Sequence, residues 1–350
     1  MQYHRLGDTG VQVSRFALGA MSFGALGNTD HDDCVRIVHA ALDAGVNFVD
    51  TADVYSSGES EAIVGKALAG RRDDVVLVSK CFWPMGTDRN QQGGSRRWIV
   101  RAVEASLTRL GTDRLDVYFL HKPDPGTALD ESLGAMSDLV HQGKVVSVGI
   151  STFPGSWITE TQWVAERSQL VRPRVEQPPY SIFSRSAERD VLPAVERFGM
   201  GAMVWGPLDN GWLTGKYRDG GAPGGAASPG ISRAERWART AVQFDAARAP
   251  VQRKFALVEA LADVARAAGI SLAHLALAFC AEHPAVSSVI LGPRTMEQLD
   301  DLLGAADLRL DPATLDAIDA LVPPGEDVDP TYAQGWTPPW LVDPSLRRRR

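Results

Sequence analysis

The sequence has little of what marks several large classes of protein. Its 350 residues include three cysteines, Cys34, Cys81 and Cys280, too few and too scattered for a disulfide framework or a zinc site. No apolar run approaches the roughly 20 residues that span a bilayer. The N-terminal segment MQYHRLGDTG has no signal-peptide core. These absences predict a cytoplasmic protein that does not enter a membrane.

A surplus of basic residues is also absent. The formal net charge is −7, and four of the positive charges lie in the terminal run Arg347 to Arg350. A negative field repels nucleic acids and anionic membranes, so neither is an expected partner, and the arginine run is expected to be solvated. Hydrophobic residues make up 44% of the chain, which is ordinary for a globular protein and excludes extensive disorder.

One pattern recurs along the chain: a short apolar run, a polar loop and a stretch with helical spacing. Most runs are almost continuously apolar, as in strands buried on both faces of a parallel sheet. The eight expected strands are Phe16–Ala20, Val46–Asp50, Val75–Lys80, Leu115–His121, Val145–Ser151, Val171–Gln177, Gly201–Trp205 and Val286–Gly292. The run that contains Pro173 is the least regular.

Helical spacing is clearest over Asp32–Ala44, Ser95–Leu110, Leu129–His141 and Met296–Leu303, and Gly111 and Gly143 are natural C-terminal caps. Parallel strands need crossover connections, and closing the sheet removes its edges, so the pattern predicts an α/β fold of the (β/α)8 TIM-barrel type. A doubly wound sheet is the alternative. It is disfavoured because no G-x-G-x-x-G follows the first strand.

We expect one domain over residues 1–350, with the barrel at about 15–305. Residues 2–14 are expected to form a β-hairpin that caps it. Long loops are expected at the C-terminal face, and the polar stretch 218–250 resembles a lid because its centre, Gly220–Gly230, cannot bury enough apolar surface to be rigid. A tail spans 322–350.

The predicted strand ends carry the candidate chemistry, because reacting groups in such barrels lie where strands end. Asp50, Lys80 and His121 end three neighbouring strands, and Tyr55 follows five residues after Asp50. Any strand end can carry a polar residue, but the convergence of acid, base and imidazole is less readily explained that way. An ion pair with Asp50 would keep Lys80 charged, and Lys80 would lower the pKa of Tyr55. His121 could hydrogen-bond the same oxygen, so the four suit proton exchange with a carbonyl or alcohol.

None of these groups can carry a hydride, so a cofactor must supply it. Trp205 offers a flat face for a nicotinamide, and Ser151 and Gln177 could bond its carboxamide. Two glycine-bearing segments could approach phosphates: Gly206–Lys216, and Gly292–Thr295, where Arg294 precedes a helix. Taken singly, Trp205, Lys216 and Arg294 are better explained as core, surface and helix-start residues, respectively.

The ordered motifs resemble those of the aldo-keto reductases, and most closely a bacterial, potassium-channel-β-subunit-like branch. They are LGDTGVQVSRFALGAMSFG at Leu6, NFVDTADVYSSGESEAIVGKAL at Asn47, VSK at Val78, LDVYFLHKPDP at Leu115, GKVVSVGIS at Gly143, EQPPYS at Glu176, WGPLDNGWLTGKY at Trp205 and ILGPRTMEQLDDLLGA at Ile290. The resemblance runs from Arg5 to about Ala305.

This resemblance implies NADP(H) bound across the C-terminal face and a catalytic tetrad at Asp50, Tyr55, Lys80 and His121. The implied cofactor contacts are Ala20 and Met21 beside the nicotinamide ribose; Ser151, Thr152, Gln177 and Trp205 at the nicotinamide; Gly206, Pro207, Leu208, Asp209, Asn210, Lys216 and Arg233 along the pyrophosphate; and Gly292, Arg294, Gln298 and Asp301 at the adenosine end. Asp50 is also implied as a cofactor contact. No metal is implied.

Two positions depart from the family pattern. Thr152 stands where the family usually has Asn, and Asp301-Leu302 stands where it usually has Glu-Asn. Arg294 favours NADP over NAD, because a guanidinium pairs with a phosphate but gains nothing from a hydroxyl.

Three functions are compatible with these residues. The leading one is NADPH-dependent reduction of aldehydes or ketones to alcohols, with hydride from the nicotinamide C4 and a proton from Tyr55. The second is an NADP-binding, redox-sensing regulatory subunit with slow turnover, against which His121 speaks because the channel subunits resembled here lack it. The third is an isomerase or aldolase with Lys80 as a Schiff base.

The substrate is expected to be a small carbonyl compound with an apolar body, because aromatic residues are expected to line the pocket. The expected wall residues are Phe23, Phe82, Trp83 and one of Trp336 and Trp340. Its identity stays open, and the protein could be a monomer or a homo-oligomer.

Overall fold

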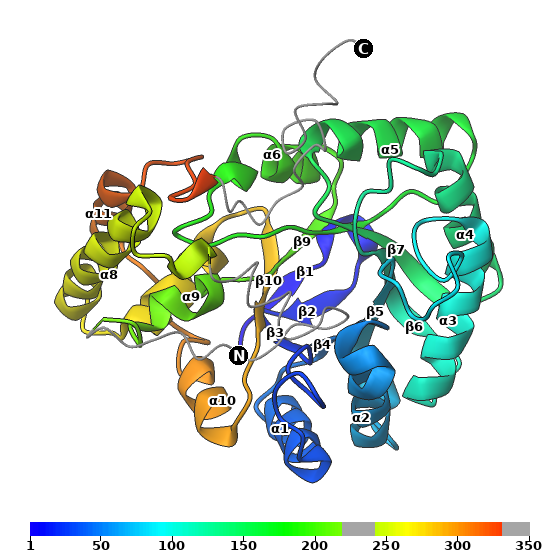
Figure 1. Cartoon of the computed structure of the whole chain (residues 1–350), viewed down its shortest axis with the longest axis horizontal. Coiled ribbons are helices and arrows are strands. Elements are labelled where there is room, and N and C mark those ends of the chain that lie inside the picture. The colour runs from blue at the N-terminus through cyan, green and yellow to red at the C-terminus, as the bar shows by residue number, and fades with distance from the viewer. Residues whose placement is uncertain (219–241, 331–350) are drawn as a thin grey trace.

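Eight parallel strands close into a barrel at the centre of the molecule, and helices surround it (Figure 1). The computed structural model describes residues 1–218 and 242–330. Within these residues the barrel strands are β3 (Phe16–Gly19), β4 (Phe48–Asp50), β5 (Val76–Cys81), β6 (Leu115–Leu120), β7 (Val145–Ser151), β8 (Val175–Gln177), β9 (Gly201–Val204) and β10 (Val286–Leu291). They follow chain order around the barrel, and β10 pairs with β3 to close it. The predicted TIM-barrel fold is therefore confirmed.

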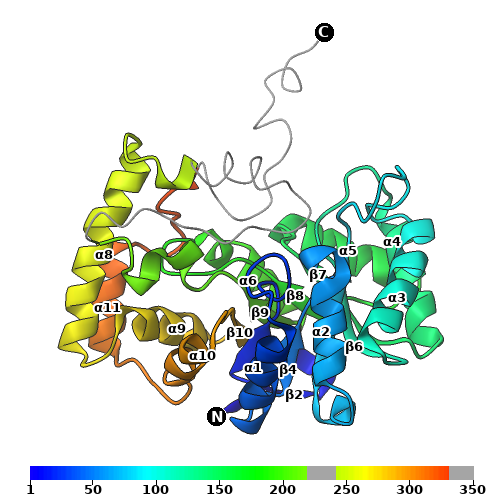
Figure 2. The same cartoon turned by 60° about the horizontal axis from the view of Figure 1, so that its bottom comes forward.

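The helices lie outside the strands and connect them. They are α1 (His31–Asp43), α2 (Glu59–Ala67), α3 (Arg96–Leu110), α4 (Leu129–His141), α5 (Gly155–Arg167), α6 (Val191–Arg197), α8 (Ala249–Ala267), α9 (Leu272–Glu282), α10 (Met296–Leu303) and α11 (Pro312–Leu321). In Figure 2, α3 and α4 lie side by side on one flank of the barrel, and α8 and α11 on the other. The four helical segments expected from the sequence are all present.

The strands are buried on both faces, which explains their continuous apolar sequences. Inward-facing side chains such as Phe48, Val78, Phe119 and Met203 form one core inside the barrel. Their outward-facing neighbours join a second, larger core between the strands and the helices. A strand placed this way needs apolar residues at every position, not at alternate ones.

The helix boundaries follow from local capping. The Asp30 carboxylate accepts hydrogen bonds from the first backbone N–H groups of α1, and Ser95 does the same for α3. At the other end of α3, Gly111 adopts the left-handed conformation, with φ of 63°, which glycine tolerates without strain.

A β-hairpin closes one end of the barrel. Strand β1 (Tyr3–Arg5) pairs antiparallel with β2 (Gln12–Ser14), as expected from the sequence. Leu6 and Val13 of this segment are buried in the core inside the barrel. The strands terminate at the opposite end, which we call the mouth of the barrel, so candidate binding residues gather there.

Most strands begin or end one or two residues away from the sequence expectation, and the start of β8 differs by more. Strand β8 begins at Val175, not Val171, because Pro173 has no N–H for the sheet and its carbonyl accepts a hydrogen bond from Gln162. The expected loop 218–250 also ends too late, because helix α8 begins at Ala249. Residues 219–241 of the expected loop and residues 331–350 of the tail lie outside the described residues.

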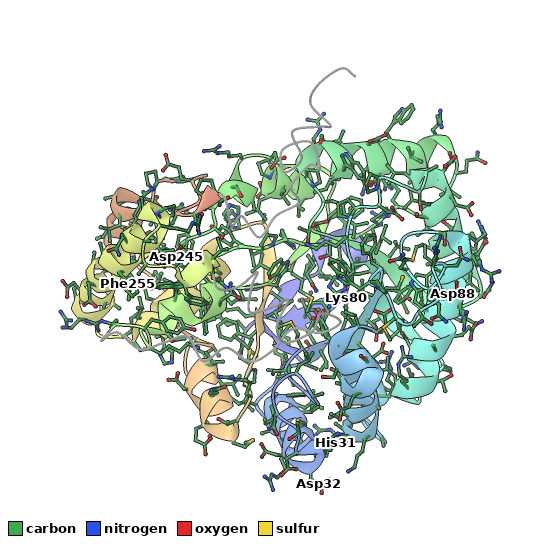
Figure 3. The ribbon with its side chains drawn as sticks, in the orientation of Figure 1. His31, Asp32, Lys80, Asp88, Asp245 and Phe255 are labelled. Atoms are coloured by element: carbon green, nitrogen blue, oxygen red, sulfur yellow. The ribbon has the colours of Figure 1, made fainter. Side chains whose placement is uncertain are left out.

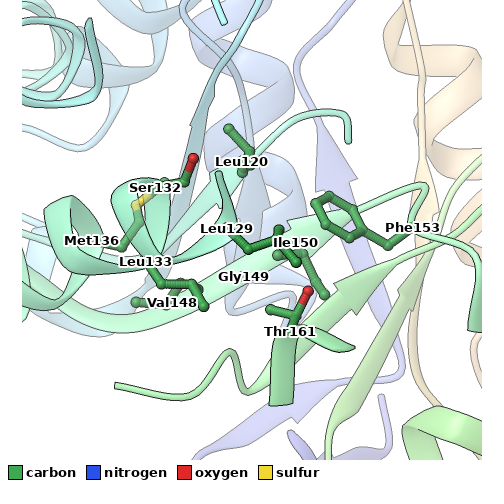
Figure 4. Close-up of a pocket in the computed structure, with 10 residues that line it drawn as sticks. All are labelled: Leu120, Leu129, Ser132, Leu133, Met136, Val148, Gly149, Ile150, Phe153 and Thr161. Carbon is green, nitrogen blue, oxygen red and sulfur yellow. The ribbon is translucent and has the colours of Figure 1, made fainter. Parts of the chain in front are cut away.

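A small gap lies between β6, β7 and the helices α4 and α5 (Figure 4). Mainly apolar side chains line it, among them Leu120, Met136 and Phe153. Its volume is about 10 Å³, the space of one water molecule. This gap is a packing defect of the barrel wall and not a ligand site.

No single helix within 1–218 and 242–330 has the length and apolar character needed to cross a membrane. Helices α8 and α9 meet these criteria only when taken together, and they are bent by 84° relative to each other.

Candidate active site

Three neighbouring strands bring the predicted catalytic residues together at the mouth of the barrel. Asp50 is the last residue of β4, Lys80 lies near the end of β5, and His121 directly follows β6. Tyr55 begins a short 3-10 turn, Tyr55–Gly58, in the loop after β4. Figure 3 shows Lys80 close to the centre of the ring of strands. The three residues predicted from the strand ends therefore lie in one cluster with Tyr55 of the loop after β4.

Lys80 is the centre of this cluster and is fully buried. Its Nζ lies 2.7 and 2.8 Å from the two carboxylate oxygens of Asp50, and it donates to the carbonyl of Thr51 at 2.9 Å. It also donates to the hydroxyl of Tyr55 at 3.3 Å. Burial opposes the charge on Lys80, but Asp50 and Tyr55 outweigh it and leave its pKa raised. The predicted Asp50–Lys80 ion pair is present.

Tyr55 departs from one expectation. Burial raises the pKa of its phenol, and the nearby Lys80 ammonium lowers it by a smaller amount, so the pKa is raised overall. Lys80 lowers the pKa of Tyr55, as expected. Burial raises this pKa by more, because the charged phenolate would lose its contact with water. The phenol is therefore protonated at neutral pH and is equipped as a proton donor.

His121 faces Tyr55 edge-on, with ring centroids 5.9 Å apart. On its other side Trp83 makes a similar contact at 6.4 Å. Burial, with smaller contributions from Lys80 and Lys122, holds the pKa of His121 well below its usual value. The imidazole is thus neutral and can both donate and accept a hydrogen bond beside the Tyr55 ring.

The next strand ends connect to this cluster. The amide of Gln177 donates to Asp50 Oδ1 at 2.8 Å, and the hydroxyl of Ser151 donates to the Gln177 carbonyl at 2.9 Å. Thr152 is buried and has a φ of 62°, a left-handed conformation that β-branched residues rarely adopt. Three polar residues at the ends of β7 and β8, or directly after β7, are therefore placed at the same mouth.

Trp205 and the segment after it form the far side of the mouth. Trp205 is half-buried, and Gly206 has a φ of 73°. Asp209, Asn210 and Gly211 have positive φ values of 43°, 56° and 90°, so this turn directs successive backbone groups in an unusual way. Pro207 and Leu208 lie within the same segment.

Two side-chain contacts stabilise the turn that contains Asp209 and Asn210. The carboxylate of Asp209 forms a buried ion pair with Lys254 of α8. The Asn210 amide donates to Gln243 at 3.0 Å.

Two cationic side chains, Lys216 and Arg294, lie beyond this turn and are close enough to influence each other. Burial and the neighbouring charge of Arg294 lower the pKa of Lys216. Within the described ranges, neither cation forms an ion pair with a carboxylate. Such a pair of uncompensated cations is suited to a phosphate group.

The residues expected to contact the adenosine end of the cofactor differ in their exposure and in their existing contacts. Gly292 is exposed beside the N-terminus of α10, and Gln298 accepts a hydrogen bond from the backbone N–H of Arg294 at 2.8 Å. Asp301 is exposed, and its Oδ1 lies 3.3 Å from Nε2 of His274. Arg233 lies outside the described residues.

The two residues expected beside the ribose also differ. Ala20 is fully buried, whereas Met21 is 45% exposed. Of the expected pocket walls, Trp83 contacts Phe82 and His121, Phe23 is fully buried, and Trp336 and Trp340 lie outside the described residues.

These residues fit a nicotinamide dinucleotide. The mouth offers a half-buried indole, an amide and two hydroxyls, a turn with three successive left-handed residues and two cations that form no ion pair with a carboxylate in residues 1–218 and 242–330. Those are the groups needed for an aromatic ring, a carboxamide and phosphates, respectively.

Sequence reasoning missed a polar network behind Tyr55. Glu61 of α2 is fully buried, accepts a hydrogen bond from Ser79 and pairs with Arg109 of α3 at 2.6 Å. Asp53, between Asp50 and Tyr55, is also buried, and burial raises its pKa well above the usual value. In the sequence, the available indication of this network was an acidic residue, Asp53, in the loop between Asp50 and Tyr55. The contacts of Glu61 tie β5 to α2 and α3.

Two further polar residues were missed at the mouth. Lys122 follows His121 and donates to Thr152 at 3.0 Å, and Glu176 accepts from the backbone N–H of Phe153 at 3.2 Å. In the sequence, the only indication that Lys122 and Glu176 lie at the mouth was that they are adjacent to His121 and Gln177.

Comparison with known proteins agrees with this barrel fold. The model of the aldo/keto reductase family matches residues 15–323. The chain is 39% identical over 329 residues to a probable voltage-gated potassium channel subunit beta of Oryza sativa subsp. japonica, covering 92% of this chain and 97% of the relative. It is 35% identical over 345 residues to the uncharacterized oxidoreductase YrpG of Bacillus subtilis (strain 168), covering 95% of this chain and 100% of the relative.

The chain therefore belongs to the aldo/keto reductase family. This is a family of oxidoreductases that generally bind NAD(P)H and act on small carbonyl compounds.

Proposed function

We propose that the protein is an NADPH-dependent reductase that converts aldehydes or ketones to alcohols. The observation that carries this proposal is the buried Lys80, whose ammonium contacts both the Asp50 carboxylate and the Tyr55 hydroxyl. A phenol held in this way, at the open end of a barrel, is placed to give a proton to a carbonyl oxygen.

Each residue of the cluster has a distinct role in this proposal. Tyr55 donates the proton, and Lys80 stabilises the negative charge that the phenol oxygen then acquires. Asp50 keeps Lys80 charged inside the barrel. The neutral His121 hydrogen-bonds the substrate oxygen and orients the carbonyl toward Tyr55. The bound cofactor supplies the hydride from its nicotinamide C4.

The residues beyond β7 would hold the cofactor. Ser151, Thr152 and Gln177 are suited to the carboxamide, and Trp205 to the nicotinamide ring. The turn from Gly206 to Asn210, with Lys216, would receive the pyrophosphate. Ala20, Met21, Gln298 and Asp301 are proposed at the ribose and adenine, as the sequence motifs imply.

Replacing Arg294 by methionine is expected to weaken NADPH binding by about 10- to 100-fold, because a charge-assisted pair with the 2′-phosphate is lost. NADH lacks that phosphate, so its Kd should change by no more than about twofold. Titration of tryptophan fluorescence with each cofactor measures both constants.

Arg266→Met is the matched control, because Arg266 is an exposed arginine on α8 that pairs only with Asp263 among the described residues. An equal loss for NADPH and NADH in Arg294→Met would exclude a 2′-phosphate contact at Arg294.

The proposed activity is tested by NADPH consumption with purified protein and a panel of aromatic and aliphatic aldehydes. Turnover that is faster with NADPH than with NADH supports it. NADPH binding without turnover on any carbonyl compound would contradict it.

A second candidate is a regulatory subunit that binds NADP(H), turns over slowly and signals through a partner. The name of the rice relative favours it. His121 favours the enzyme instead, because it completes the proton-donating cluster. Single-turnover reduction followed by arrest, together with a stable complex with another protein, would favour the regulatory subunit.

A further inference from the structure

Lys122 places a positive charge among the groups proposed to hold the nicotinamide. Its Nζ donates to the Thr152 hydroxyl at 3.0 Å and lies over the Trp205 ring, 5.8 Å from the ring centroid. These three residues follow β6, β7 and β9, and the side chain of Lys122 is half-buried at the mouth. The ammonium is therefore held beside the proposed nicotinamide site.

The backbone at Thr152, which accepts the hydrogen bond from Lys122, is strained. A β-branched residue with a φ of 62° is rare, because its side chain crowds the main chain. Glu176 supports the loop by accepting a hydrogen bond from the backbone N–H of Phe153. Strain of this kind persists only where the surroundings impose it, and it is typical of binding sites.

The acidic neighbour that acts on Lys122 is Glu176, and its effect on the pKa of Lys122 is smaller than that of burial. In the part of the chain that the structure describes, Lys122 forms no ion pair with a carboxylate. Asp50 is paired with Lys80, and burial raises the pKa of Glu176 well above its usual value. His121 is neutral because burial lowers its pKa.

We propose that the Lys122 ammonium sets the oxidation-state preference of the bound cofactor, weakening the binding of NADP⁺ relative to NADPH. The oxidised nicotinamide ring carries a positive charge and the reduced ring carries none, so a nearby fixed cation repels only the oxidised form. This inference rests on the proposed function, because it needs the nicotinamide to lie at Thr152 and Trp205. Its consequence is easier release of the oxidised cofactor after each reduction.

The test is the ratio of two dissociation constants, Kd(NADP⁺) over Kd(NADPH), measured by isothermal titration calorimetry at pH 7. Lys122→Met is expected to lower this ratio by about tenfold, mainly through tighter NADP⁺ binding, the size expected for one partly screened charge at short range. Lys122→Arg keeps the charge and should keep the ratio within about twofold of the original.

Two controls separate this effect from general damage. Adenosine 2′,5′-bisphosphate has no nicotinamide, so its Kd should be the same for the original protein and Lys122→Met. Lys216→Met removes a cation proposed at the pyrophosphate, so it should weaken NADP⁺ and NADPH equally and leave their ratio unchanged.

The ratio should also depend on pH. Burial lowers the pKa of Lys122 to about 8, so the ammonium is charged below that pH and neutral above it. The ratio should therefore fall as the pH rises from 7 to 9 in the original protein and stay constant in Lys122→Met. The other titratable groups around Lys122 are Glu176, His121 and the Lys80–Asp50 pair, and a ratio that still changed with pH in Lys122→Met would assign the pH dependence to them.

The outcomes distinguish the two proposals. If both cofactors bind and Lys122→Met leaves the ratio unchanged, the inference about Lys122 is wrong and the proposed function stands. If neither cofactor binds the original protein, both are overturned.

Discussion

Tyr55→Phe is expected to reduce kcat for aldehyde reduction by about 10²- to 10⁴-fold, the usual contribution of a positioned general acid. The substitution removes one oxygen atom, the atom that accepts a hydrogen bond from Lys80 at 3.3 Å. The ring remains to pack against His121, so the fold and the cofactor affinity should be retained. Steady-state kinetics and NADPH titration of the same preparation measure the two quantities.

Tyr118→Phe is the control for this experiment. Tyr118 is also fully buried, but it lies on β6 in the core between the strands and the helices, not inside the mouth. Its loss of a hydroxyl should leave kcat within about threefold, as for a residue outside the reaction. An active Tyr55→Phe variant would remove Tyr55 from the proposed mechanism.

Lys80→Met has the second large expected effect, on stability as well as on activity. Removing Lys80 leaves the Asp50 carboxylate buried, with the Gln177 amide as its remaining side-chain partner among the described residues. Breaking a buried ion pair from one side costs about 3–5 kcal/mol in the free energy of unfolding. Urea denaturation measures this loss, and reductase activity should disappear because Tyr55 loses its charged neighbour.

The double variant Lys80→Met/Asp50→Asn separates the two effects. A neutral amide in place of Asp50 should restore most of the lost stability, because no buried charge is left unpaired. It should not restore activity. A Lys80→Met protein as stable as the original would contradict the buried ion pair.

Much of the barrel could be predicted from the sequence, because a strand buried on both faces must be apolar throughout. The segment VVLVSK, for example, corresponds to β5 with an error of one residue at each end. The start of β8 could not be predicted in this way. Val171 is apolar, but Pro173 removes the hydrogen bond that would have extended the strand.

The positions of Asp50, Lys80 and His121 were predictable because parallel strands end at the same face of a barrel. The pKa of Tyr55 was not, since it depends on the balance between burial and the charge of Lys80. Lys122 was not predicted either. A lysine after a strand end is common, and only the structure reveals its contacts with Thr152 and Trp205.

The most direct test of the proposed reaction uses NADPH carrying deuterium at the transferred C4 position of the nicotinamide, with an aromatic aldehyde as substrate. Mass spectrometry of the product should find an alcohol with one deuterium on the former carbonyl carbon, in amounts equal to the NADPH oxidised. Alcohol without deuterium, or oxidation of NADPH without alcohol, would contradict hydride transfer to a carbonyl at this site.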